Sequence, residues 1–103
     1  MDRLTLEQYS EKIDIPVSEL EGASRVPEIA LARQAYWYYL KQHGIILIDI
    51  ASMFNRKQHS TIISGINTIK DMIDTNNNTI NRYLDAMGYN YEENTFSHQD
   101  ISN

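Results

Sequence analysis

The sequence predicts an all-α domain, and three observations support this fold class. Four glycines and two prolines among 103 residues are too few for a turn-rich β domain. Apolar residues recur at spacings of three and four along several segments, which is the period of an amphipathic helix. Short polar breaks with capping residues or glycine separate these segments. The length suits one small domain, and a hydrophobic share of 42% is enough to form its core.

The first half of the chain predicts three helices. Thr5-Leu6-Glu7-Gln8 has the form of a capping box and opens a helix over residues 5–13, which ends before Pro16. Residues 18–22 form one short turn of helix with a cap at each end. Pro27 opens a longer helix that runs to Gln42, with Gly44 as its stop. Because this helix is apolar on most sides, we expect it to be central in the domain.

The second half predicts a helix-turn-helix and one more helix. A helix over residues 47–54, a polar break and a helix over residues 59–73 follow each other closely. Along the second of these, Ile62, Ile66, Ile69 and Ile73 step by 4, 3 and 4 and form one face. A last helix over residues 79–87 has Thr79 as cap and Gly88 as stop. This helix could pack on the domain, form a homodimer seam or dock another protein.

Four consecutive aromatic residues, Tyr36 to Tyr39, lie on the long helix. They could be a stacking platform for single-stranded bases, but aromatic side chains at this density favour a core position. We expect Tyr38 to be the member that points outward.

Composition excludes several functional classes. The absence of cysteine rules out disulfides and thiolate zinc sites and fits a reducing cytosol. No apolar run approaches the roughly 20 residues of a membrane helix, and the first residues carry no secretory signal. The histidines lack metal-ligand spacing, and no serine, histidine and aspartate lie in a nucleophile-elbow context. We therefore expect a cytoplasmic, nucleoid-associated protein that is not an enzyme and needs no cofactor, metal or membrane.

Charge is unevenly distributed along the chain. The net charge is −5, which argues against a nucleic-acid partner when taken as a whole. Residues 25–70, however, hold six bases and two acids, whereas six acids and one base follow in residues 71–103. Because fields decay over about 10 Å in moderate salt, the basic middle matters more than the total.

The tip of the second helix of the helix-turn-helix carries side chains suited to DNA. In this motif the N-terminus of the second helix enters the major groove. Glutamine can pair with adenine, and hydroxyl groups can bond to bases or phosphates. The side chains in question are Lys57, Gln58, His59, Ser60 and Thr61. A two-helix corner alone is a weak signal, since many all-α proteins contain one.

Three blocks of the sequence together resemble one family. Residues 25–34, RVPEIALARQ, resemble its R-x-R-E-I-x-x-A-R-Q opening, and residues 47–54, LIDIASMF, resemble its L-x-E-I-G-x-x-F helix. Residues 57–62, KQHSTI, resemble its R-D-H-[ST]-T-V signature. The family is the duplex-binding C-terminal domain of the bacterial replication initiator DnaA. The resemblance covers about residues 5–73 and implies a helix-turn-helix bundle of the Trp-repressor-like type with, in this chain, an extra C-terminal helix.

The resemblance implies a set of DNA contacts at matching positions. Arg25 falls on the arginine that enters the minor groove, and Arg33 and Lys41 fall on positions that contact phosphate. His59, Ser60 and Thr61 fall on the residues that read the major groove. Double-stranded DNA is thus the implied partner, and sequence-specific binding related to replication-origin recognition or its regulation is the implied function.

Departures from the family pattern limit this expectation. The motif aspartate is Gln58, which both donates and accepts hydrogen bonds, so the preferred site can differ or specificity can be looser. Arg56 replaces a glycine and adds a phosphate contact, while Pro27 replaces an arginine. No Gly-rich phosphate loop is present, so we expect a detached module without nucleotide.

The domain organisation follows from these observations. We expect residues 1–75 to form the helix-turn-helix domain and residues 76–103 to add a short helix and a polar tail. A rival interpretation is a non-catalytic protein-protein interaction domain that kept the fold and lost DNA binding, which the acidic ends and Gln58 favour.

Overall fold

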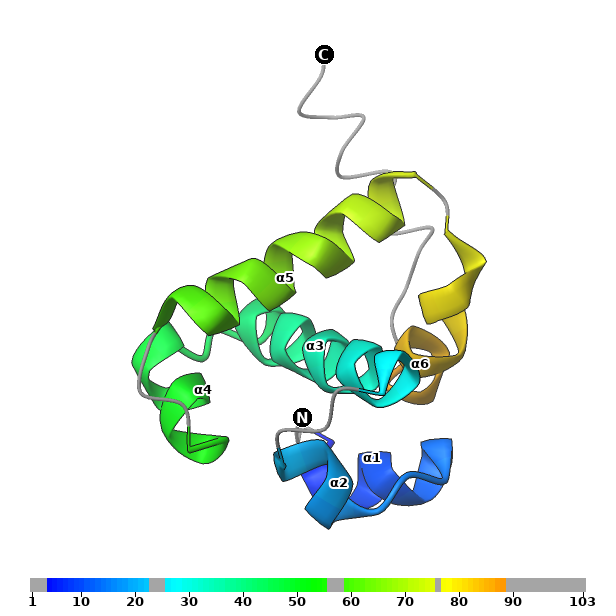
Figure 1. The fold of residues 1–103 in the computed structure, drawn as a ribbon, viewed down its shortest axis with the longest axis horizontal. Helices are drawn as coiled ribbons and strands as arrows, with labels where there is room; N and C mark the ends of the chain where they lie inside the picture. The colour runs from blue at the N-terminus through cyan, green and yellow to red at the C-terminus, as the bar shows by residue number, and fades with distance from the viewer. Residues whose placement is uncertain (1–3, 23–25, 56–58, 76, 89–103) are drawn as a thin grey trace.

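The computed structural model describes residues 4–22, 26–55, 59–75 and 77–88. These residues form helices and no strands, which confirms the all-α prediction. The elements in chain order are α1 (Leu6–Ile13), α2 (Val17–Glu21), α3 (Pro27–Gln42), α4 (Leu47–Met53), α5 (His59–Asp74), the 3-10 turn η1 (Asn78–Ile80) and α6 (Asn81–Ala86). In Figure 1, α3 runs through the middle, with α5 above it, α1 and α2 below, and α4 and α6 at opposite ends.

Helix α1 begins with the predicted capping box. The Gln8 backbone N–H donates to Thr5 Oγ1 at 3.1 Å, and the Thr5 N–H donates to Gln8 Oε1 at 2.9 Å. The helix ends at Asp14, which has a left-handed φ of 60°. Helix α2 follows after Pro16, which has no side chain able to cap it, so the predicted cap at the start of this turn is absent.

Helix α3 is the central element of the fold, as its apolar sides predict. It contacts α2, α4, α5, η1 and α6. Gly44 ends the α3 segment with a φ of +84°, a left-handed conformation that glycine adopts without strain.

The aromatic run of α3 lies in the core, but the predicted outward member is wrong. Tyr38 is only 5% exposed, because neighbouring elements cover α3 on several sides. Tyr39 is the half-buried member of the run. Its hydroxyl accepts a hydrogen bond from the Leu4 N–H at 2.8 Å.

Helices α4 and α5 form the predicted helix-turn-helix. Ile50 and Phe54 of the α4 segment are fully buried. On α5, Ile62, Ile66 and Ile69 are buried and Ile73 is half-buried, so the isoleucine face packs inward as expected.

The last helix begins later than predicted, and Thr79 is not its cap. The Thr79 N–H donates to Asn77 Oδ1 at 2.9 Å, so Asn77 caps η1, whereas the N-cap of α6 is Ile80, which makes no side-chain cap hydrogen bond. The 3-10 turn η1 precedes α6, which spans only Asn81–Ala86, and Gly88 then has a φ of +73°.

Helix α6 packs on the domain, which was one of the alternatives left open. Leu84 is fully buried in the same core as α3. Arg82 Nη2 donates to the Ile13 carbonyl at 2.9 Å, and the Tyr83 hydroxyl donates to the Glu28 carbonyl at 3.3 Å. Within the described part of the chain, no helix is both long and apolar enough to cross a bilayer.

Candidate functional site

The first turn of α5 presents its polar side chains to solvent. His59, Ser60 and Thr61 are all exposed, whereas Ile62 directly after them is fully buried. The first backbone N–H groups of a helix lack intrahelical acceptors, and the helix dipole adds partial positive charge there. This end of α5 can therefore offer both side-chain and backbone hydrogen bonds to a partner.

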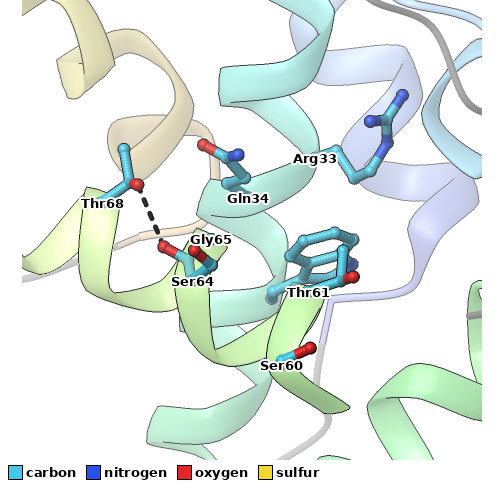
Figure 2. A pocket seen from close by; sticks show the side chains of 8 residues that line it. Arg33, Gln34, Ser60, Thr61, Ser64, Gly65 and Thr68 are labelled. Carbon is cyan, nitrogen blue, oxygen red and sulfur yellow. Dashed lines mark hydrogen bonds between the residues drawn. The ribbon is translucent and has the colours of Figure 1, made fainter. Parts of the chain in front are cut away.

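A polar groove of about 450 Å³ runs between α5 and the middle of α3. Its α5 wall carries the hydroxyl groups of Ser60, Thr61, Ser64 and Thr68. Figure 2 shows these residues on α5, with Gln34 of α3 beside Ser64 and Thr68. The Thr68 hydroxyl donates to the Ser64 carbonyl at 3.0 Å, the interaction that the dashed line marks. We call this space the hydroxyl groove.

Gly65 and Trp37 form the floor of the hydroxyl groove. A Cβ atom at Gly65 would lie 2.6 Å from Trp37 Cε3 and 2.9 Å from Gln34 Cγ. Only glycine allows α5 to approach α3 this closely. Trp37 is 2% exposed, and its Nε1 is buried without a hydrogen-bond partner among the described residues.

Arg33 lines the hydroxyl groove, but its guanidinium is engaged on the far side. Its Nε donates to the Leu20 carbonyl at 2.8 Å, and its Nη2 donates to the Glu19 carbonyl at 3.3 Å. Figure 2 shows the guanidinium pointing away from Thr61, toward the first helices of the chain. With 6% of its surface exposed, Arg33 holds the C-terminal end of α2 against α3.

Lys41 lies on the other flank of α5 from the hydroxyl groove. Its exposed side chain borders a second, smaller groove of about 200 Å³, which Lys70 of α5 also lines. We call this the lysine groove. The structure therefore separates Lys41 from Arg33, although both were expected to contact phosphate.

Four of the predicted site residues lie outside the described residues. They are Arg25, Arg56, Lys57 and Gln58. The last three directly precede His59 in the sequence, so their chain position is next to the exposed first turn of α5.

The hydroxyl groove includes residues that the sequence analysis did not single out. These are Gln34, Ser64, Gly65 and Thr68. Thr61, Ser64 and Thr68 are spaced by three and four, which places them along one helical face. This spacing is the signal in the sequence that marks the polar face of α5, next to the isoleucine period that marks its buried face.

Comparison with known proteins assigns a family. The family model described as the bacterial dnaA protein helix-turn-helix matches residues 6–69. No solved structure matches this chain.

Curated relatives carry the name chromosomal replication initiator protein DnaA. The one from Picosynechococcus sp. is 32% identical over 72 residues, covering 69% of this chain and 16% of that protein. The Crocosphaera subtropica protein is 31% identical over 70 residues, covering 67% and 15%, and the Microcystis aeruginosa protein is 36% identical over 61 residues, covering 58% and 14%. The matched region thus spans about a sixth of these relatives. Since the family match covers more than half of the chain and includes the helix-turn-helix, the chain belongs to the bacterial dnaA protein helix-turn-helix family.

Proposed function

We propose that this chain binds double-stranded DNA sequence-specifically, in replication-origin recognition or its regulation. The observation that carries this proposal is the exposed first turn of α5, where three polar side chains precede a fully buried isoleucine. Because Ile62 anchors α5 in the core, the first turn of the helix can enter a major groove and contact base edges there. The family and its relatives' name as replication initiators support the same class of function.

The proposed contacts are of two kinds, those to base edges and those to phosphates. Gln58, His59, Ser60 and Thr61 would read the major groove, and Arg25 would read the minor groove. Lys41, Arg56 and Lys57 would hold phosphates. Arg33 is the least direct of the proposed phosphate contacts, because two carbonyls of α2 already engage its guanidinium.

The first experiment selects bound duplexes from a random pool with the full chain and then titrates the selected duplex at several salt concentrations. We expect one preferred sequence. We also expect the logarithm of the binding constant to fall linearly with the logarithm of the salt concentration, with a slope of about −0.9 per neutralised phosphate. If no duplex is retained even at low salt, the proposal is wrong.

Variants then locate the reading surface. Thr61→Ala is expected to weaken binding of the selected duplex, and Thr79→Ala is its matched control, since Thr79 is an exposed threonine on η1. His59→Ala should cost about 1–3 kcal/mol on the selected site and much less on a scrambled duplex. Equal losses on both duplexes would place His59 outside the reading surface.

A second candidate function is a protein-protein interaction domain without DNA binding. Its support is the net charge of −5 together with exposed apolar side chains on and near α4. Ile46 is 58% exposed, Ile48 is 56% exposed and Met53 is 44% exposed. Failure of the duplex selection, with the chain shown to be folded, would favour this function.

A further inference from the structure

The lysine groove combines an apolar floor with a basic rim. Leu47, Ile63 and Ile66 line it, and Ile63 remains 42% exposed. Lys41 at the end of α3 and Lys70 on α5 stand on its border, both exposed. Ile66 is buried, but the Ile63 side chain stays partly in water in a groove that two lysines also line, which indicates a surface that a partner can cover.

The volume and the charge of the lysine groove indicate what kind of group it can bind. Its volume of about 200 Å³ lies below the roughly 300–1,000 Å³ of small-molecule sites. One apolar or aromatic side chain is therefore a better fit than a whole ligand. The two lysines favour acidic groups beside that side chain, because opposite charges across an interface fix its register.

Such a segment is present in this chain at residues 89–103. It contains Glu92, Glu93 and Asp100, it has no lysine or arginine, and it carries aromatic side chains, including Phe96. We propose that residues 89–103 dock in the lysine groove, with Phe96 on the apolar floor and the neighbouring glutamates facing Lys41 and Lys70.

The starting point of this segment is fixed by α6. The Tyr83 hydroxyl donates to the carbonyl of Glu28, so α6 lies beside the first turn of α3. Lys41 lies in the last turn of the same helix. Thirteen residues of helix separate Glu28 from Lys41, which is about 20 Å along the axis.

The length of chain after Gly88 favours Phe96 over Tyr91 as the docked aromatic side chain. Tyr91 comes three residues after Gly88, and Phe96 comes eight residues after it. An extended chain spans about 3.3–3.6 Å per residue, so Tyr91 reaches about 10 Å and Phe96 about 27 Å. Of the two, Phe96 can span about 20 Å, the length of α3 between Glu28 and Lys41, and Tyr91 cannot, which makes Tyr91 a matched aromatic control in the same segment.

Docking would have a consequence for DNA. The segment would cover Lys41 and bring negative charge to a flank of α5. It would therefore compete with a duplex for this surface. This consequence rests on the proposed function, whereas the docking itself does not.

The test uses the full chain without DNA. Because the chain has no cysteine, Ser97→Cys gives one attachment point for a nitroxide spin label. We expect the label to broaden the amide signals of Ile63, Asn67 and Lys70 and to leave those of Glu7 and Glu11 on α1 sharp. Phe96→Ser in the labelled chain should restore the groove signals, and Tyr91→Ser should not. Broadening that is absent, uniform or centred elsewhere would overturn the proposal.

Two further measurements remove alternative explanations. Without a label, Phe96→Ser should shift the amide signals of Ile63 and Lys70, and Tyr91→Ser should leave them unshifted. Mixing an isotope-labelled chain that lacks the nitroxide with a nitroxide-labelled chain tests docking onto a second copy. We expect no broadening in this mixture. If the signals of the lysine groove broadened in the mixture as much as they do when the nitroxide is on the same chain, docking within one chain would be overturned.

Discussion

Gly65 sets how closely α5 approaches α3. A Cβ atom there would meet the six-membered ring of Trp37 at 2.6 and 2.7 Å, distances that packed atoms do not adopt. The ring has little room to move, since it is 2% exposed and lies edge-on to Phe54 with 5.7 Å between ring centroids. Glycine at this position is thus a packing requirement, although glycine in a helix is locally unfavourable.

We predict that Gly65→Ala destabilises the protein. Higher helix propensity would contribute about 1 kcal/mol in favour of alanine, but overpacking in a dense core typically costs about 1–3 kcal/mol and should prevail. Urea unfolding followed by the fluorescence of Trp37, the chain's one tryptophan, measures the difference. Ser64→Ala, at an exposed position of the same helix, is the control and should change stability little. A stabilised Gly65→Ala variant would show that α3 and α5 lie further apart.

Tyr9 should make stability sensitive to alkaline pH. Burial, aided by the nearby Tyr83, raises the pKa of the Tyr9 phenol far above its ordinary value of 10.0, and its hydroxyl donates to the Ala32 carbonyl at 2.7 Å. Above that ordinary value the unfolded chain loses a proton that the folded chain keeps. The stabilisation is therefore complete below about pH 10 and is lost as the pH rises further.

The variant Tyr9→Phe tests this linkage. It should cost about 1 kcal/mol at neutral pH through the lost hydrogen bond. It should also flatten the decline of unfolding free energy above about pH 10 by up to about 1.4 kcal/mol per pH unit. Urea midpoints measured from neutral to alkaline pH provide the comparison. An unchanged slope would mean that the Tyr9 phenol is not buried as described.

At the scale of elements, α2 depends on Arg33. A helix of five residues has little stability of its own, because helix nucleation is costly. The Arg33 guanidinium binds the carbonyls of Leu20 and Glu19 at the end of α2, where helical acceptors lack intrahelical donors. One side chain of α3 thereby fixes the position of a short neighbouring helix.

Arg33 and Lys41 should respond oppositely to substitution. Arg33→Ala is expected to lower the free energy of unfolding by about 1–3 kcal/mol, because buried carbonyls lose a charged donor. Lys41→Ala should stay within about 0.5 kcal/mol of the wild type, since its side chain is exposed, while weakening duplex binding. Chemical unfolding and duplex titration of both variants separate the two roles. An Arg33→Ala variant with unchanged stability and weakened binding would instead assign Arg33 to the DNA surface.

The sequence predicted the elements whose signals are local. The capping box at Thr5, the stop at Gly44 and the isoleucine period of α5 depend on neighbours within a few residues, and the structure confirms all three. The predicted start of the last helix was wrong, because the 3-10 turn η1, which Asn77 caps, precedes α6. Helix α6 itself begins without a side-chain cap, so no capping residue in the sequence marks its start.

Features that depend on residues far away in the sequence were predicted less well. Whether Tyr38 or Tyr39 is more exposed depends on which sides of α3 are covered, and helical spacing does not report that. The guanidinium of Arg33 meets carbonyls thirteen and fourteen residues away, on an element whose placement cannot be read locally. The exposed tip of α5 was predictable, because its residues precede the buried face in the same helical period.

At the scale of the whole molecule, hydrogen bonds join the N-terminal end of the described chain to α3, and α6 to α1. The Tyr36 hydroxyl donates to the Leu4 carbonyl at 2.8 Å, and Arg82 reaches the carbonyl of Ile13 across 69 positions of sequence. Long-range contacts of this kind couple α1, α3 and α6 into one core.

This coupling predicts that α6 unfolds together with the rest. Leu84 is fully buried, so Leu84→Ala should lower the free energy of unfolding by about 2–5 kcal/mol. Asp85→Ala, at an exposed position of the same helix, is the control and should have little effect. Because α6 shares its core with α3, the urea midpoint from Trp37 fluorescence should fall by the same amount as the midpoint from far-ultraviolet circular dichroism. If the circular dichroism midpoint fell while the Trp37 midpoint stayed in place, α6 would be an appendage that unfolds separately, and residues 4–75 would keep their core without it.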